Sequence, residues 1–375
     1  MLKALDAVAG RALCWVLPLF ARHGGEASSR SAPERVLVIR PGGIGDAVLF
    51  LPMLRALRHE WPRCQLDLLV EARNAGVVRQ TDLADRVLRY DRPLSDLRAT
   101  LRTRYDLVID TEQYHRLSAV VALLTGAPQR IGFGTNSRRR LLTATIAYDQ
   151  KLYEAYSFLQ LARLVTGREP EWNRELPFYD VSPAALQFAD DKLAPLHSRV
   201  CVAIHPGASI PERRWPPERY AVLARMLAQQ GVGIVILGGP SDGRAASVIA
   251  DHLEGHPHVN LAKACDLMQA AAVVSRASVY VSADSGVLHL AYGVGTPTVH
   301  LFGPGVLSKW GPPGSKFRVV AVSLPCSPCT RFGFTPPCCQ GLRCMLGITP
   351  RHVYEAVRDQ LAKQGHRVPA AELIQ

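Results

Sequence analysis

A single carboxylate follows a glycine-rich turn near the start of the chain. In RVLVIRPGGIGDAVLF, an apolar run from Arg35 leads to Gly42, Gly43 and Gly45, and then to Asp46 at the start of a helical pattern. Glycine lets the backbone approach a ligand closely. An acid at a helix start also complements the helix dipole and caps the helix. Asp46 is therefore either a structural cap or a general base beside a bound ligand.

The same loop also has a nucleotide-binding interpretation. GGIGDA follows a strand pattern, and Glu71 ends the next strand, where dinucleotide-binding folds place an acid on the ribose. The full G-x-G-x-x-G pattern is absent, and Asp46 stands where a pyrophosphate would need neutral or positive surroundings. These features favour a base over a phosphate site, with a nicotinamide-dependent oxidoreductase as the alternative enzyme.

Residues suited to an anionic ligand lie in the second half of the chain. HPGASIPERRWP carries Ser209 and Arg213 on a loop before a helix, and the planar fork of arginine suits diphosphate oxygens. In SADSGVLHLAYG, Ser285 and Gly286 mark a turn from strand to helix, where free backbone N–H groups bind anions.

An aspartate precedes that turn and a histidine follows it. Asp284 would repel a phosphate, so we expect it to accept hydrogen bonds from sugar hydroxyls. His289 lies one helical turn after the serine, and a single histidine on an apolar helix is more typical of core packing than of catalysis.

Strand and helix patterns alternate in two stretches of the chain. Continuous apolar strands joined by helices predict parallel sheets covered on both faces. Pro52 predicts a kink or a late start in the first helical pattern. The expected strands are 35–39, 65–70, 106–111, 130–134, 200–207, 233–239, 258–262, 278–284 and 297–303. The expected helices are 54–61, 116–126, 153–167, 216–231, 242–253, 266–277, 286–295 and 353–363.

The expected architecture is α/β, with two Rossmann-like, doubly wound domains facing a cleft. Ligands in such sheets bind beyond the carboxyl ends of the strands, where the glycine-rich loops lie. We expect an apolar segment and linker at 1–34, a first domain at 35–180, a second at 181–350 and a closing helical region at 351–375. The interdomain link falls near the proline-rich stretch 171–186.

The composition limits the partners of the protein. The chain has 375 residues and a formal net charge of +12. No nucleic-acid-binding motif accompanies this charge, so nucleic acid is not an expected partner. Residues 1–22 are apolar but interrupted by Asp6 and Arg11, which disfavours a membrane span or a secretory signal. They are either a helix lying on a membrane surface, with Trp15, Leu17, Leu19 and Phe20 on one side, or a helix packed on the protein.

Four motifs in a fixed order resemble one enzyme family. RPGGIGDAVLFLPMLRAL, HPGAS followed by RRWP, ILGGPSD and ADSGVLHLAYGVGTPTVHLFGP are similar to the ADP-heptose:lipopolysaccharide heptosyltransferases of glycosyltransferase family 9, over about residues 35–355. The resemblance implies the GT-B fold, with the acceptor on the first domain and the nucleotide sugar on the second. It also implies inversion at the anomeric carbon without an essential metal.

The resemblance also implies roles for individual residues. Asp46 matches the general base of the family, on a loop where Gly43 and Gly45 contact substrate. Arg213 stands where the family usually has a lysine on the donor phosphates. The family's D-[TS]-G-x-x-H donor motif is matched by Asp284, Ser285, Gly286 and His289. On the same basis Asp242 is placed near the nucleotide ribose and Leu267 near the base.

Inverting glycosyl transfer requires a base for the acceptor hydroxyl and positive charge for the leaving diphosphate. No D-x-D triplet for a bridging metal occurs in the chain, so basic residues must neutralise the diphosphate. In the first domain, Arg138, Arg139 and Arg140 form a basic run. We expect it either to meet anionic groups of a lipopolysaccharide core or to be an ordinary solvated loop.

Five of the nine cysteines cluster in CSPCTRFGFTPPCCQGLRC. The spacing of Cys326, Cys329, Cys338 and Cys344 is compatible with a structural zinc or an iron–sulfur cluster, or with disulfides. The other four cysteines are expected to be reduced. No cofactor is expected for the reaction itself.

The leading interpretation is an inverting glycosyltransferase that moves heptose, or a related sugar, from ADP-heptose to an acidic lipopolysaccharide core. It would work in the cytoplasm, on the inner face of the cytoplasmic membrane. The alternatives are an NAD-dependent oxidoreductase and a non-catalytic protein that binds nucleotide sugars.

Overall fold

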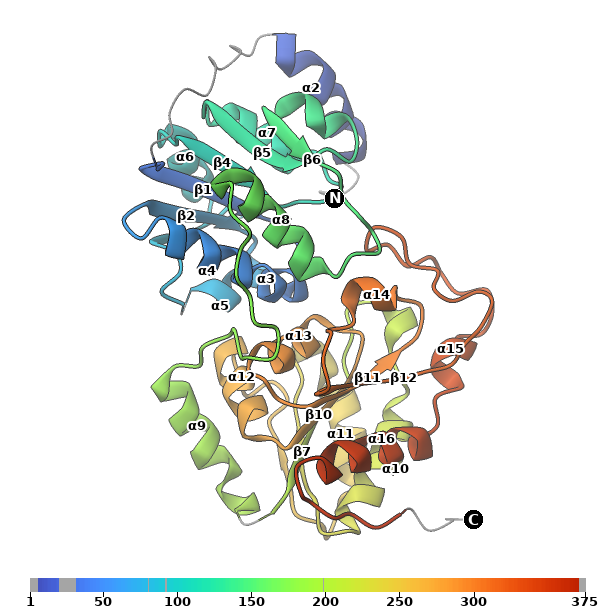
Figure 1. Cartoon of the computed structure of the whole chain (residues 1–375). Helices are drawn as coiled ribbons and strands as arrows, with labels where there is room; N and C mark the ends of the chain where they lie inside the picture. The colour runs from blue at the N-terminus through green and yellow to red at the C-terminus, as the bar shows by residue number, and fades with distance from the viewer. Residues whose placement is uncertain (1–5, 20–31, 80, 92, 198, 371–375) are drawn as a thin grey trace. The chain divides into compact units, whose positions relative to one another are not determined.

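Two six-stranded parallel sheets, one in each half of the chain, form the framework of the protein (Figure 1). The structure is a computed structural model that describes residues 6–19, 32–79, 81–91, 93–197 and 199–370. Phe20 and residues 23–31 of the expected linker lie outside the described residues. The chain divides into two units, Met1–Trp172 and Asn173–Gln375. This division falls inside the proline-rich stretch at 171–186.

The first sheet has the strand order β3-β2-β1-β4-β5-β6, and every pairing is parallel. Its central strands are apolar and buried because helices cover both faces. The register places Val38 opposite Leu68 on one side and Ile109 on the other. The strands are β1 (Arg35–Arg40), β2 (Gln65–Val70), β3 (Arg86–Arg89), β4 (Leu107–Asp110), β5 (Gln129–Phe133) and β6 (Ala144–Ile146).

Helices cover both faces of the first sheet (Figure 1). The first helical pattern breaks at Phe50 and restarts with Pro52 in its first turn, which confirms the expected interruption. One face carries α3 (Ile44–Leu49), α4 (Leu51–Glu60), α5 (Ala72–Val78) and α8 (Glu154–Thr166). The other carries α6 (Leu94–Arg102), α7 (Leu117–Leu124), η3 (Ser137–Leu141) and the amino-terminal segment of η1 (Asp6–Gly10), α2 (Arg11–Val16) and η2 (Leu17–Leu19).

The second sheet repeats the topology of the first, with the order β12-β11-β10-β7-β8-β9 and parallel pairing throughout. Tyr280 is paired with both Ala203 and Thr298 in the centre of the sheet. The strands are β7 (Cys201–His205), β8 (Gly233–Ile236), β9 (His258–Asn260), β10 (Val279–Ala283), β11 (Thr298–Phe302) and β12 (Phe317–Ala321).

The helices of the second unit again form two layers, and α16 packs with α10 and the strands β10 to β12. One layer contains α10 (Pro217–Ala228), α11 (Gly243–Asp251) and α16 (Pro350–Ala362). The other contains α9 (Pro183–Leu193), α12 (Leu267–Arg276) and α13 (Gly286–Gly293). The short elements are η4 (Ala194–Leu196), η5 (Pro211–Arg213), η6 (Pro240–Asp242), α14 (Leu307–Trp310) and α15 (Arg343–Leu346).

This strand order identifies where a ligand would bind in each unit. The order reverses between β1 and β4 in the first sheet and between β7 and β10 in the second. Ligands of open parallel sheets bind at these switch points, beyond the carboxyl ends of the strands. The loop that carries Asp46 follows β1, and the loop that carries Asp284 follows β10. Among the described residues, no helix is long and apolar enough to span a membrane.

Candidate active site

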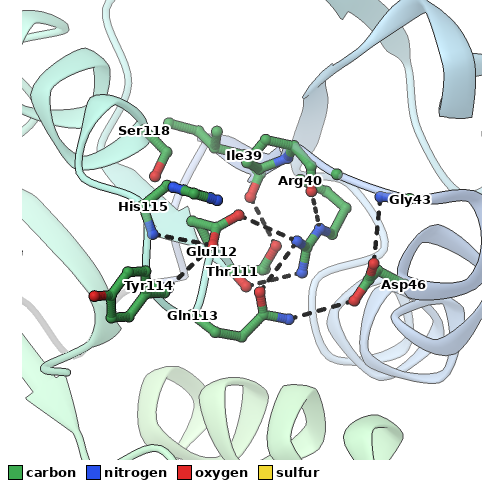
Figure 2. Close-up of polar contacts among 12 residues, drawn as sticks. Ile39, Arg40, Gly43, Asp46, Thr111, Glu112, Gln113, Tyr114, His115 and Ser118 are labelled. Atoms are coloured by element: carbon green, nitrogen blue, oxygen red, sulfur yellow. Dashed lines mark hydrogen bonds and ion pairs between the residues drawn. The ribbon is translucent and has the colours of Figure 1, made fainter. Parts of the chain in front are cut away.

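The loop after β1 places Asp46 in the first turn of α3 (Figure 2). Gly42 has φ +114°, and a Cβ there would lie 3.1 Å from Nη2 of Arg40, so a side chain would be strained and crowded. The backbone N–H of Gly43 donates to Oδ2 of Asp46 at 3.3 Å. The capping role expected of this carboxylate is therefore present, and it engages one of the two oxygens.

The second oxygen of Asp46 is held only loosely. Nε2 of Gln113, from the loop after β4, lies 3.5 Å from Oδ1 of Asp46, at the limit of a hydrogen bond. The same amide nitrogen donates to the buried carboxylate of Glu154. Asp46 itself is half-buried. A loosely held, partly accessible carboxylate oxygen is what a general base needs to accept a proton.

Arg40 is the cation of this site, and it is almost fully buried. Its Nη1 donates to the carbonyl of Thr111 at 3.0 Å, and its Nη2 lies 3.5 Å from Oε2 of Glu112 (Figure 2). Burial lowers the pKa of Arg40, but the charges of Asp46 and Glu112 outweigh burial and raise it above its ordinary value. Arg40 is therefore a fixed positive charge beside the candidate base.

Glu112 lies in the loop after β4, two residues beyond the end of the strand. Its Oε1 accepts backbone hydrogen bonds from Tyr114 at 3.0 Å and His115 at 3.2 Å. Burial alone would raise the pKa of Glu112, but the charges of Arg40 and His115 act in the opposite direction. The pKa of Glu112 is therefore below its ordinary value. Sequence reasoning found neither Arg40 nor Glu112, although both lie within two residues of a predicted strand end at a switch point.

Glu71 supports the loop after β1 and is itself closely engaged. Its Oε1 accepts the N–H of Gly42 at 3.2 Å, and its other oxygen pairs with Arg73. It also accepts a hydrogen bond from the hydroxyl of Tyr90. Through these contacts Glu71 holds the loop after β1 in place.

The basic run at 138–140 divides into one structural arginine and two exposed ones. Arg138 is fully buried, pairs with Asp110 and donates to the carbonyl of Phe133 at 2.8 Å. The expectation that it meets the acceptor is wrong, because the first residues of η3 turn it into the protein. Arg139 and Arg140 are exposed, so the expectation stays a prediction for them.

In the second unit, Arg213 and Asp284 are brought together from the loops after β7 and β10. Nη1 of Arg213 lies 3.0 Å from Oδ2 of Asp284, and both side chains are largely buried. Nη2 of Arg213 also donates to Oγ1 of Thr335 at 3.3 Å. Burial raises the pKa of Asp284, and Arg213 opposes that rise. Asp284 is therefore engaged by the arginine in this structure, and its role toward sugar hydroxyls stays a prediction.

The motif residues after Asp284 start helix α13. Ser285 precedes its first residue, Gly286, and the hydroxyl of Ser285 lies 3.1 Å from that of Ser282. The structure makes no side-chain cap at this helix start, so backbone N–H groups of the first turn remain for an anion. Ser209, on the loop after β7, is exposed.

His289 is buried in α13, as expected for a packed histidine. Burial, followed by the charge of Arg213, lowers the pKa of His289 to about 4. The neighbouring His300, 4.0 Å from Asp284, also has its pKa well below the ordinary value because of burial. Nδ1 of His289 and both ring nitrogens of His300 form no hydrogen bond within the described structure. Buried polar atoms are ordinarily hydrogen-bonded, so this cluster is a candidate ligand-binding surface.

This shift predicts how stability depends on pH. The unfolded chain takes up a proton at His289 near pH 6.5, whereas the folded chain does so only near pH 4. The contribution of neutral His289 to the free energy of unfolding is fully present above about pH 6.5. It is lost as the pH falls toward 4, which lowers that free energy by about 3 kcal/mol. We expect His289→Gln to flatten this part of the profile of melting temperature against pH. His252→Gln, at an exposed histidine, serves as the control; an equal effect of both changes would contradict the prediction.

Asp242 is held by the loop that follows β8. Its Oδ2 accepts the N–H of Gly239 at 2.8 Å, and Nε2 of His205 lies 3.6 Å away. The neighbouring His205, followed by the hydrogen bond from Gly239, lowers the pKa of Asp242 against the effect of burial. Leu267 is half-buried at the first position of α12. The proposed ribose and base contacts of these two residues stay predictions.

The cysteines are all free, and no disulfide links them. Cys14, Cys64 and Cys201 are buried, in line with reduced core residues. Within the part of the chain that the structure describes, no group of three or more His, Cys, Asp or Glu is arranged to hold a metal. The structure therefore gives no support to zinc or an iron–sulfur cluster at Cys326, Cys329, Cys338 and Cys344.

Two Rossmann-like units in tandem define the GT-B class of glycosyltransferases. Residues 94–335 match the profile of Glycosyltransferase family 9 (heptosyltransferase), and the chain belongs to this family. It is therefore a glycosyltransferase, and an oxidoreductase is not favoured. The chain is 25% identical over 350 residues to lipopolysaccharide heptosyltransferase 2 of Salmonella typhimurium, a match that covers 88% of this chain and 99% of the relative.

Solved structures share the fold. The E. coli ADP-heptose LPS heptosyltransferase II structure matches with a TM-score of 0.72 at 23% identity, covering 88% of this chain and 100% of that one. A family 9 glycosyl transferase from Veillonella parvula matches with a TM-score of 0.77 at 20% identity, covering 88% and 98%. Both similarities extend over both units of the chain.

Proposed function

We propose that this glycosyltransferase moves a heptose from ADP-heptose to an anionic acceptor in the core of lipopolysaccharide, with inversion at the anomeric carbon. One observation carries the proposal: Arg213 and the Asp284–Ser285 turn meet at a switch point, in a chain that matches the heptosyltransferase family. The names of the Salmonella and E. coli relatives support the same donor and acceptor.

In the proposed reaction Asp46 acts as the general base. The acceptor oxygen forms a bond to the anomeric carbon while the bond from that carbon to the diphosphate breaks. The hydroxyl proton passes to Asp46, whose Oδ1 is held only by the weak contact with Gln113. ADP leaves with the bonding electrons. Arg40 provides a buried positive charge close to Asp46.

The leaving diphosphate carries the charge that the second unit must stabilise. Arg213 offers a planar guanidinium, and the first turn of α13 offers backbone N–H groups without a side-chain cap. Both are already positioned in the folded chain, so little reorganisation is needed at the moment of bond cleavage. Ser209 and Asp242 would contact the donor from the loops after β7 and β8.

The acceptor is expected to be anionic and bound by the first unit. Arg139 and Arg140 are its exposed basic residues in η3, and Gly43 and Gly45 let the acceptor approach the backbone next to Asp46. Because the lipid anchor that carries a lipopolysaccharide core is held in a membrane, we place the reaction at the cytoplasmic face of the inner membrane.

Ligand-dependent stabilisation tests the choice of donor. A ligand that binds only the native state raises the melting temperature, by an amount that corresponds to about 2.7 kcal/mol at one hundred times its dissociation constant. We expect ADP to raise the melting temperature more than UDP, GDP or NAD at the same concentration. Stabilisation by NAD alone would contradict the proposal and favour an oxidoreductase.

A further inference from the structure

The amino-terminal segment exposes an apolar stripe on its outer side. Along η1, α2 and η2, Val8 is 78% exposed, Trp15 54%, Val16 49% and Leu19 77%. These positions recur at helical spacing and point away from the buried Asp6 and Cys14 on the inner side. The inner side packs on α7 and η3, so the segment is apolar on both sides, and among the described residues only the inner side has a packing partner.

Basic side chains surround this stripe. Arg11 is exposed in α2, and Arg139 and Arg140 are exposed on the adjoining η3. The guanidinium carbon of Arg140 lies 3.9 Å from the centroid of the Trp15 ring, a cation–π contact that joins the two elements into one surface. The only acid of the segment Asp6–Leu19 is Asp6, which is buried and caps α7. The outer surface is therefore apolar and cationic, without a negative side chain of its own.

We propose that this outer face, formed by Val8, Arg11, Trp15, Val16, Leu19 and Arg140, docks onto an anionic lipid surface. Tryptophan and leucine enter the interface between lipid head groups and acyl chains, while arginine pairs with anionic head groups. A helical segment that lies in the membrane plane needs this combination of one apolar stripe and flanking cations. A surface of this kind attaches reversibly, with an affinity that falls as salt is raised.

The charge of the outer face argues against a second copy of the chain as its partner. A two-fold contact would place the same patch on both sides, so the arginines of one copy would meet a face whose charged side chains are again arginines. That arrangement would bury like charges, and no acid of the face would compensate them. An anionic bilayer supplies opposite charge to every arginine of the face.

The segment that carries the outer face is hydrogen-bonded to an element next to Asp46. Oδ1 of Asp6 accepts the N–H groups of Arg116 at 2.6 Å and Leu117 at 2.7 Å, at the start of α7. The loop that leads into α7 carries Gln113, which contacts Asp46. Docking would therefore hold the unit that carries the candidate base at the membrane. This last step rests on the proposed function, whereas lipid binding itself does not.

Vesicle sedimentation tests the proposal. We expect the full-length protein to sediment with vesicles of phosphatidylcholine and phosphatidylglycerol, and much less with phosphatidylcholine alone or at high salt. Leu19→Glu combined with Trp15→Ala should lower the partition coefficient at least tenfold, because the two changes remove the largest apolar side chains of the face. The matched control is Leu94→Glu, at a leucine that is 66% exposed on α6 of the same unit; it should bind vesicles like the parent.

Further readouts separate the outcomes. Unchanged melting temperature and unchanged transfer to a delipidated, soluble acceptor show that the double variant is folded and that only docking is affected. Equal vesicle binding by the parent and the double variant would overturn the proposal. So would a parent that ignores vesicles but self-associates through Leu19, because a second copy would then cover the face. Vesicle binding without any glycosyl transfer would leave docking intact and reject the proposed function alone.

Discussion

Asp46→Asn is expected to lower kcat by about a thousandfold and to leave ADP binding unchanged. General bases contribute about 10²–10⁴ to the rate of such reactions, and asparagine cannot accept the acceptor proton. The substitution is nearly isosteric, and the amide oxygen can still accept the N–H of Gly43, which now bonds Oδ2 at 3.3 Å. Loss of rate would therefore reflect lost chemistry and not a lost helix cap. The measurement is steady-state transfer from ADP-heptose, alongside the ADP-induced rise in melting temperature.

The chain offers a matched control for this substitution. Asp96 lies in the first turn of α6, where an acid complements the helix dipole, and it accepts the N–H of Arg89 at the end of β3 at 3.0 Å. It does not lie at the switch point, and Asp96→Asn should keep the parent turnover. Full activity of Asp46→Asn would remove this residue from the mechanism. Activity lost equally in both variants would mean that the helix start matters and not the base.

The central strands were predictable from sequence, whereas the edges of the sheets were not. β1, β7 and β10 are runs of apolar residues buried on both faces, and such runs are visible without any tertiary information. The missed strands are β3 and β6, at the two edges of the first sheet, and β12, at an edge of the second, and all three are partly exposed. Arg86–Arg89 reads RVLR, a short and charged pattern typical of an edge strand, and propensity alone does not distinguish it from a loop.

Candidate site residues could be predicted where a loop motif contains them. They could not be predicted where the pairing of two strands brings them together. Asp46, Arg213 and Asp284 lie in or beside glycine- or proline-rich loops at strand ends, so their positions at those ends could be inferred locally. Arg40 and Gln113 become neighbours only because β1 pairs with β4, which brings together residues 73 positions apart. No local pattern reports that pairing.

The error at Arg138 has a similar origin. Three consecutive arginines look alike in sequence, but a 3₁₀ turn directs one inward and leaves the others at the surface. The inward arginine requires a buried anion, and Asp110 supplies it from β4, 28 residues away. Because the partner lies on another strand, only the fold shows which arginine is structural.

Arg213→Ala is expected to lower kcat/KM by about 10²–10³ and to weaken ADP binding. Removing one preorganised donor to a developing negative charge has an effect of this size in other enzymes. The change also leaves the buried carboxylate of Asp284 without its cation, now 3.0 Å away, so we expect a loss of stability of about 3–5 kcal/mol. The two effects are measured separately, by transfer kinetics with ADP titration and by thermal melting.

Arg213→Lys separates charge from geometry at the same position. Lysine keeps a positive charge near Asp284 but lacks the planar fork, so stability should largely return while kcat/KM recovers only in part. Arg225→Ala removes an exposed arginine from α10 and should change neither quantity. If Arg213→Ala has a lower melting temperature but the ADP affinity and turnover of the parent, the only role of the arginine is to pair with the buried carboxylate. The leaving diphosphate must then be neutralised by other groups, with the N–H groups of α13 as the first candidates.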